Sequence, residues 1–287
     1  MTPPTVSSLR DETVRTLAAA GVVTPDADAE LLIGHVLGLS RGEVQAKAVT
    51  GTAVAPAEAD AVLALVERRA AREPLQHITG VAPFRSLELA VGPGVFVPRP
   101  ETELAAQLAI DALVAVASPH PLALDLGTGS GAIALALATE VPHARVVAVE
   151  RSPEAHAWAD RNIRASGADN IRLVLGDLAD ALPELDGRVD VVASNPPYIP
   201  DDAIPRDVEV RLHDPAMALY GGPDGLDVVR ALSRRALALL RPGGVLVIEH
   251  GELQGAEIRA LLAADGWRAP ATHRDLLGRD RVTTALR

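Results

Sequence analysis

Residues 122–139 have the sequence LALDLGTGSGAIALALAT, in which a glycine-rich loop separates two apolar runs. The first run, Leu122–Leu126, is typical of a buried strand, and the second, Ala132–Thr139, is helical in character. The glycines between them allow a tight turn and let the backbone approach a ligand at the helix N-terminus. A strand, a glycine loop and a helix in this order predict the start of an open α/β sheet.

The alternation of strands and helices continues to the C-terminus. We expect further strands at Val146–Glu150, Ile171–Gly176, Val189–Ser194, Val245–Glu249, Trp267–Thr272 and Arg281–Leu286, and helices at Pro153–Ser166 and Leu226–Leu240. Short strands that alternate with helices indicate an open, mainly parallel sheet, and the last two strands are expected to close it as a pair. The predicted fold class is therefore α/β, with a sheet of seven strands.

The chain has 287 residues, which suits one large or two ordinary domains. Residues 1–78 predict a small helical bundle, in which Pro25 opens a helix and Ser8 caps the first one. Alternating residues within 79–99 predict a β-hairpin linker, and the sheet domain occupies 100–287. The bundle is expected either to recognise a partner or to act as a structural cap.

Composition excludes several classes of protein. The chain has no cysteine, which rules out disulfides, thiolate metal ligands and cysteine nucleophiles, and its eight histidines are too scattered to predict a metal site. The net charge of −11, with Lys47 as the only lysine, argues against nucleic acid as a direct partner and suits a basic protein partner. No long apolar run or signal pattern is present, so we expect a cytoplasmic protein without a membrane partner.

The stretch Asn195-Pro196-Pro197-Tyr198 directly follows the strand predicted at Val189–Ser194. The two prolines fix the backbone direction and lack N–H groups, so the backbone mainly presents carbonyl acceptors beside the Asn195 amide and the Tyr198 ring. Such a corner suits a flat group that carries an NH2, with the N–H bonds accepted on one side and a ring against the plane. The alternative is a stiff exit from the strand without chemistry.

Candidate ligand groups follow four consecutive strands, at the edge where open α/β sheets bind ligands. The loop Asp125–Gly131 also matches the dinucleotide fingerprint, but the Asp125 carboxylate suits a cationic or amino-bearing ligand such as S-adenosylmethionine better than a pyrophosphate. Glu150 either binds both hydroxyls of a ribose or is a solvated acid at a strand end. Asp177 could accept the amino N–H of an adenine.

These motifs resemble a known family. The DxGxGxG loop, the acid after the second strand and NPPY after the fourth are similar to the amino-group branch of class I S-adenosylmethionine-dependent methyltransferases. Further stretches resemble the release factor glutamine methyltransferase family: EPLQHITG at 73–80, VPRPETE at 97–103, PAMALYGGPDGL at 215–226, PGG at 242–244, EHG at 249–251, and residues 275–282. The resemblance implies a Rossmann-like class I methyltransferase fold.

The resemblance also implies the reaction, namely methyl transfer from S-adenosylmethionine to the side-chain amide nitrogen of the glutamine in the Gly-Gly-Gln motif of class-1 peptide chain release factors. We expect a monomer with Asn195, Pro196 and Tyr198 as catalytic residues and Phe96, Asn195, Pro196, Pro197 and Tyr198 as substrate-binding residues. The expected cofactor-binding residues are Asp125, Gly127, Thr128, Gly129, Ser130, Gly131, Glu150, Asp177, Leu178 and Asn195.

Three positions depart from the family pattern. Glu150 stands where an aspartate is usual, Leu178 where an aromatic ring is usual, and Asp214 where a glutamate is usual. The sequence is also compatible with four other functions: a glutamine methyltransferase for a ribosomal protein, an adenine-N6 methyltransferase, a dehydrogenase, or a cofactor-binding scaffold without activity. No strong general base is expected beside NPPY, since the proton can leave after methyl transfer.

Overall fold

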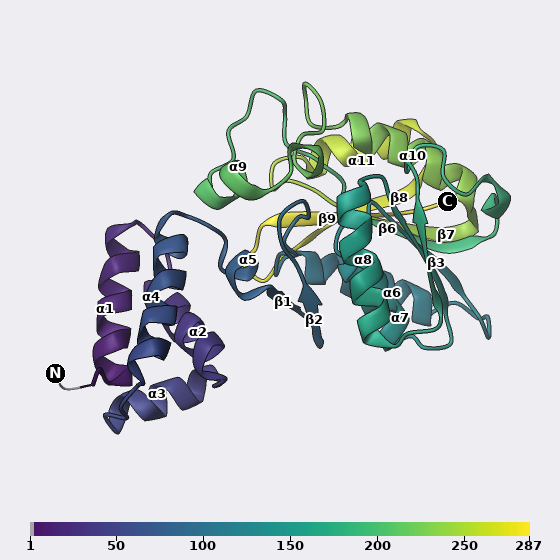
Figure 1. The fold of residues 1–287 in the computed structure, drawn as a ribbon. Helices are drawn as coiled ribbons and strands as arrows, with labels where there is room; N and C mark the ends of the chain where they lie inside the picture. The colour runs from purple at the N-terminus through teal and green to yellow at the C-terminus, as the bar shows by residue number, and fades with distance from the viewer. Residues whose placement is uncertain (1–2) are drawn as a thin grey trace. The chain divides into compact units, whose positions relative to one another are not determined.

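The computed structural model describes residues 3–287, and these residues pack as two units (Figure 1). One unit runs through Val81 and also takes Pro205–His213, while the other comprises Ala82–Ile204 and Asp214–Arg287. The predicted domain boundaries at residues 78 and 99 stay predictions. Residues 205–213 belong to the first unit, although the residues on either side of them belong to the second. No pattern in the sequence predicts this assignment.

The first unit is helical. Its helices are α1 (Val6–Ala19), α2 (Pro25–Leu37), α3 (Arg41–Val49), α4 (Pro56–Ala70), α5 (Leu75–Thr79) and α9 (Val208–His213). Helix α1 begins earlier than expected: Thr5 is its N-cap, and Ser8 is the third residue of the capping box rather than the cap. The prediction for Ser8 was wrong because both residue types can cap, and only the Thr5 backbone is extended.

The second unit begins with a hairpin, β1 (Val81–Phe84) and β2 (Leu87–Ala90), followed by α6 (Thr102–Val114). The main sheet contains β3 (Leu122–Leu126), β4 (Arg145–Glu150), β5 (Ile171–Leu175), β6 (Val189–Ser194), β7 (Leu240–Glu249), β8 (Arg268–Arg274) and β9 (Asp280–Leu286). Its strand order is β5-β4-β3-β6-β7-β9-β8, and only β9 runs antiparallel to its neighbours, which are β7 and β8. The predicted seven-stranded, mainly parallel sheet is confirmed.

Two apolar cores lie on opposite faces of this sheet. The helices that connect the strands are α7 (Ala132–Glu140), α8 (Pro153–Ser166), α10 (Asp227–Leu239) and α11 (Gly255–Ala264), with short 3-10 turns at Pro183–Leu185 and Ala216–Ala218. Helices α6 and α7 contribute buried residues to one core, and α10 and α11 to the other. The central strands β3 and β6 are buried along their whole length, which explains their continuous apolar sequences.

Strand β7 is longer than expected. It starts at Leu240 instead of Val245, because Leu240 pairs with Val189 across an irregularity that the Pro-Gly-Gly sequence accommodates. Its far end, Glu249, pairs with Val282 of β9. None of the helices formed within 3–287 has the length and apolar character needed to cross a membrane.

Candidate active site

The parallel register brings the predicted site residues to one edge of the sheet. Asp125 on β3 aligns with Ala148 of β4 and Ala193 of β6, so all three strands end close together. Glu150 is the last residue of β4, and Asn195 follows the last residue of β6. Residues far apart in the sequence thus meet at the carboxyl ends of neighbouring strands, where open α/β sheets bind ligands.

The glycine loop is tied down at its base and open above. The N–H groups of Gly127 and Thr128 both donate to the Val149 carbonyl of β4, at 2.9 Å. Gly127 and Gly129 have φ values of 79° and 58°, and a Cβ atom at either would meet nothing within 4 Å. These glycines are therefore required by backbone conformation, and the space above them is free for a ligand.

Asp125 organises this loop from beneath. Its side chain is buried, and Oδ2 accepts hydrogen bonds from the Thr128 hydroxyl at 2.6 Å and the Ala134 N–H at 3.0 Å. The other oxygen, Oδ1, is buried without a hydrogen-bond partner. Burial raises the pKa of Asp125 to about 7, although the bonds from Thr128 and Ala134 oppose the rise. An unpaired buried carboxylate oxygen at a ligand edge is a place for a cationic or N–H-bearing group.

Glu150 joins the loop to the next helix. Its Oε2 accepts the Gly129 N–H and its Oε1 accepts the Ser152 N–H, each at 2.8 Å, and the residue is buried. The carboxylate therefore holds the tip of the glycine loop against β4. This structural role has no signal in the sequence, which predicts Glu150 only as a ribose acceptor or a solvated acid. Each carboxylate oxygen still has a second lone pair that can accept from a ribose.

Asp177 and Leu178 lie just beyond β5. Asp177 forms an ion pair with Arg151 at 3.2 Å, and both side chains are well exposed. Its Oδ1 also accepts the Ala179 N–H. Leu178 is partly buried against the core on the α10 and α11 face. Leu178 therefore offers an apolar contact at this edge, whereas the Asp177 side chain is exposed and paired with Arg151.

The NPPY segment is held from below by glycines and a glutamine. Gln254 donates to the Tyr198 carbonyl at 2.9 Å. A Cβ atom at Gly225 would lie 2.3 Å from that carbonyl oxygen, and one at Gly221 would lie 2.6 Å from the Pro197 carbonyl oxygen. The stretch 215–226, which sequence reasoning used only for its resemblance, is thus the support on which NPPY rests.

Tyr198 and Phe96 are the two aromatic rings among the predicted substrate-binding residues. Burial, together with the charge of Glu249, raises the pKa of the Tyr198 phenol, which is therefore neutral at physiological pH. The Arg99 guanidinium lies 5.0 Å from the centre of the Phe96 ring and pairs with the buried Asp214 at 2.7 Å. Asp214, one of the departures from the family pattern, thus keeps a carboxylate that anchors the residue stacked on Phe96.

Asn195 contacts two residues to which sequence reasoning assigned no role. Its Nδ2 donates to the Thr102 hydroxyl at 3.3 Å. Glu249, almost completely buried, receives hydrogen bonding from Thr102 and Asn195 that lowers its pKa, but burial dominates and raises that pKa to about 7. Thr102 and Glu249 lie in the stretches VPRPETE and EHG, and only the tertiary structure shows that these stretches converge on NPPY.

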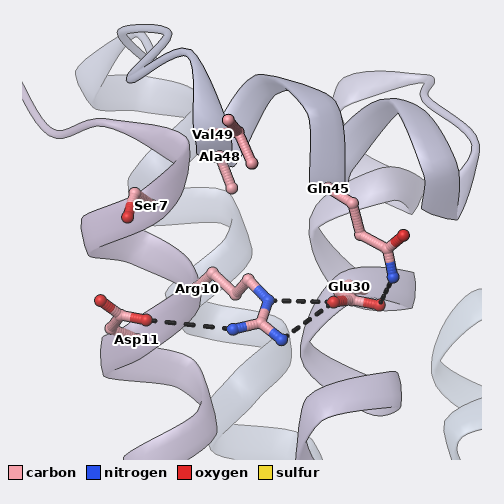
Figure 2. A pocket seen from close by; sticks show the side chains of 7 residues that line it. All are labelled: Ser7, Arg10, Asp11, Glu30, Gln45, Ala48 and Val49. Carbon is pink, nitrogen blue, oxygen red and sulfur yellow. Dashed lines mark hydrogen bonds and ion pairs between the residues drawn. The ribbon is translucent and has the colours of Figure 1, made fainter.

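A separate pocket of about 410 Å³ lies in the helical unit and is lined by residues between Ser7 and Val49, all of which precede the sheet in the sequence (Figure 2). Its floor is the buried Glu30, whose two oxygens accept from Arg10, Arg41 and Gln45. Because every charge is paired, this network serves to join α1, α2 and α3. Across residues 3–287, no cluster of three or more His, Asp or Glu side chains could hold a metal ion.

The fold and the glycine loop define a class I methyltransferase. A methyltransferase domain model matches residues 119–269, and a PrmC N-terminal domain model matches residues 8–80. A methyltransferase from Pyrococcus furiosus has a similar fold, with a TM-score of 0.51 at 22% identity over 70% of this chain and 89% of that one.

Relatives narrow the class. The chain is 50% identical to the release factor glutamine methyltransferase of Streptomyces coelicolor, over 94% of this chain and 93% of the relative. It is 47% identical to the Mycolicibacterium smegmatis protein of the same name, over 95% and 94%. The chain belongs to the release factor glutamine methyltransferase family. A 4-amino-L-phenylalanine/4-methylamino-L-phenylalanine methyltransferase of Streptomyces pristinaespiralis is also similar, at 41% identity over 99% and 96%.

Proposed function

We propose that this enzyme transfers a methyl group from S-adenosylmethionine to the side-chain amide nitrogen of the glutamine in the Gly-Gly-Gln motif of class-1 peptide chain release factors. The observation that carries the proposal is the placement of NPPY beside the glycine loop at one sheet edge, in a chain that shares half its residues with a relative of that name. Release factors as substrates would also place the activity in the cytoplasm.

The residues around the glycine loop suit S-adenosylmethionine, which supplies the methyl group when bound. Gly127 and Gly129 leave space for it, and the unpaired Oδ1 of Asp125 can face a positive charge. Thr128, Ser130 and Gly131 complete the loop. Glu150 would accept from the ribose, and Leu178, beside Asp177, would cover the adenine by apolar contact. We expect Glu150→Ala to weaken binding by about 1–3 kcal/mol, because it removes a charged acceptor and releases Gly129. Unchanged affinity in calorimetry would remove Glu150 from the site.

At the substrate side, Asn195 Oδ1 and the Pro196 carbonyl would accept the two amide N–H bonds. This arrangement would orient the nitrogen for in-line attack and favour the positive charge that develops on it during methyl transfer. The neutral Tyr198 phenol, Phe96 and Pro197 would pack against the amide plane in an apolar pocket. Such a pocket favours a reaction in which the sulfonium loses its charge.

One relative, 41% identical to this chain, is named as a methyltransferase of 4-amino-L-phenylalanine, which is a small aromatic amine. That amine is also a flat NH2 group, so NPPY alone does not separate the two substrates. A glutamine in a ribosomal protein and an adenine amino group fit the same corner. The net charge of −11 favours a basic protein surface over nucleic acid, and we propose a monomer with no nucleic-acid partner.

One assay separates these substrates. Radiolabelled S-adenosylmethionine is offered with a purified release factor, ribosomal proteins, DNA or 4-amino-L-phenylalanine in parallel reactions. We expect label in the release factor, and none when its Gly-Gly-Gln glutamine is changed to alanine. Label in the amine or in a ribosomal protein, with an unlabelled release factor, would overturn the proposal. The Asn195→Ala variant serves as the control for methyl transfer by a contaminating enzyme.

A further inference from the structure

Glu249 is a buried acid that the proposed reaction does not use. It ends β7, is 1% exposed, and its Oε2 has no hydrogen-bond partner. Leaving a carboxylate oxygen unpaired in the interior is costly, so its position calls for an explanation. The side chains that hydrogen-bond toward this carboxylate are Thr102, on the first turn of α6, and Asn195 of NPPY.

The role proposed for Asn195 depends on the orientation of its amide. An asparagine amide has nearly the same shape when it is turned by 180°, but the turn exchanges an acceptor for two donors. In the turned state Asn195 would present N–H groups to a substrate NH2, and the two could not bond. Something must therefore hold Nδ2 away from the substrate, and the Nδ2 bond to Thr102 does so.

A threonine hydroxyl cannot fix that orientation by itself, since it both donates and accepts. An ionised carboxylate only accepts, so it draws the Thr102 hydrogen and leaves the hydroxyl lone pairs for Asn195 Nδ2. We propose that Glu249, acting on Asn195 directly and through Thr102, fixes the Asn195 amide so that Oδ1 faces the substrate, which makes Glu249 and Thr102 positioning residues. This inference rests on the function proposed above, because it assumes an N–H-bearing substrate at Asn195.

The charge of Glu249 is sensitive to pH. Burial and the nearby charge of Glu101 raise its pKa to about 7, against the opposing effects of the Thr102 hydrogen bond and the charge of Arg281. Tyr198, on the substrate side, is neutral, and His250 next to Glu249 has a lowered pKa because it is buried. When Glu249 is protonated it can donate a hydrogen bond to Thr102, so the hydrogen bonds between Asn195, Thr102 and Glu249 no longer have one fixed direction. Turnover should therefore rise with pH through about 7.

The test compares three variants in steady-state methylation of the release factor. Glu249→Gln replaces the carboxylate by an amide, which donates hydrogen bonds as well as accepting them. We therefore expect kcat at pH 8 to fall by about tenfold, which corresponds to one misplaced hydrogen bond. Thr102→Val should give a similar loss, and Thr102→Ser, which keeps the hydroxyl, should stay within threefold of the wild type. The affinity for S-adenosylmethionine, measured by calorimetry, should change by less than twofold in all three.

Two controls separate positioning from a general effect. Glu257→Gln makes the same chemical change at an exposed position of α11 and should leave kcat unchanged. The rise of kcat through pH 7 should be present in the wild type and absent in Glu249→Gln. The inference is overturned when Glu249→Gln and Thr102→Val both retain kcat within twofold, or when the loss follows cofactor affinity alone, or when the pH profile is unchanged.

The outcomes also separate this inference from the proposed function. Wild-type enzyme that leaves the release factor unlabelled refutes the function, whatever the variants do. Labelled release factor with fully active variants refutes only the role of Glu249. Should Glu249→Gln fail to fold, judged by thermal unfolding, the comparison of Thr102→Val with Thr102→Ser still decides, because equal activity of these two variants would contradict the relay.

Discussion

At the scale of single residues, the chemistry depends on acceptors held in defined directions. Asn195, Asp125 and Glu150 all lie at strand ends and are bonded to the protein. Asn195 and Asp125 each keep one side-chain oxygen for a ligand, and Glu150 keeps a second lone pair on each of its bonded oxygens. The same carboxylates that would meet the ligand also hold the loop that contains them. Binding and local folding are thus coupled at this edge of the sheet.

Asn195→Ala should remove most of the turnover and leave cofactor binding largely intact. The loss in kcat should be on the order of 10²–10³, as for other groups that hydrogen-bond mainly in the transition state. Single-turnover methylation measures the rate, and calorimetry measures cofactor affinity. A variant within threefold of the wild type would contradict the role assigned to Asn195.

The buried charge of Glu249 should make stability depend on pH. Its pKa is 4.5 as a free side chain and about 7 in the folded protein. Between these values the unfolded chain releases a proton that the folded protein keeps, so the free energy of unfolding falls as pH rises from 4.5 to 7 and remains low above. Glu249→Gln removes this loss and should raise stability at pH 8 by up to about 3 kcal/mol relative to its effect at pH 4.

Urea unfolding at the two pH values measures that difference. Thr102→Ser provides the reference, because it keeps Glu249 and alters the same cluster. Equal effects of Glu249→Gln on the free energy of unfolding at pH 4 and pH 8 would show that folding does not raise the pKa of Glu249.

At the scale of elements, the segment 215–226 supports NPPY by close backbone contact. Gly225 has a φ of 76° and no room for a Cβ atom beside the Tyr198 carbonyl. Gly225→Ala should therefore destabilise the protein by about 1–3 kcal/mol and shift NPPY enough to lower kcat at least tenfold. Thermal unfolding and the methylation assay measure the two effects.

Gly176 provides the matched control for Gly225→Ala. It lies directly after β5, has no positive φ, and a Cβ atom there would meet nothing within 4 Å. Gly176→Ala should leave both stability and kcat close to the wild type. Similar losses in the two alanine variants would mean that the close contact with Tyr198 is not what makes glycine necessary at 225.

At the scale of the whole molecule, one short segment leaves the sheet unit to join the helical unit. Residues 205–213 follow NPPY in the sequence, and Glu209 within them accepts from Arg69 and Arg72 at 2.8 and 2.6 Å. Arg69 in turn pairs with the buried Asp28 of α2. Burial would raise the pKa of Glu209, but the bonds from Arg72 and Arg69 lower it to about 2, so Glu209 stays charged at neutral pH.

Removing Glu209 should release this segment from the helices. Glu209→Ala leaves two arginines without their shared partner and should cost about 1–3 kcal/mol, between the values for exposed and buried pairs. Trypsin should then cut faster at Arg206 and Arg211, which lie in the released segment. Asp202→Ala, at an exposed acid of the preceding loop, is the control and should leave the cutting rate unchanged. Equal rates of trypsin cleavage in the two variants would contradict the role of Glu209 in holding residues 205–213 against the helices.

Much of the fold was predictable because local patterns and tertiary packing agree. Strands β3 and β6 and helix α8 have the bounds expected from their apolar periodicity and caps. The start of β7 was missed because the Pro-Gly-Gly sequence normally interrupts a strand, and pairing with Val189 overrides that preference. The first helix was misplaced by three residues because Thr5 and Ser8 are both good caps.

By itself, the amino-acid sequence determined the class of the sheet, the glycine loop and the rigid NPPY corner, since each depends on residue types within a few positions. Only the tertiary structure decided that Thr102 and Glu249 stand behind Asn195, that Glu150 holds Gly129, and that residues 205–213 pack with the helices. The physical reason is that these contacts join residues distant in the sequence. No local propensity encodes them, and only the parallel register of the strands and the packing of α6 and α9 bring the partners together.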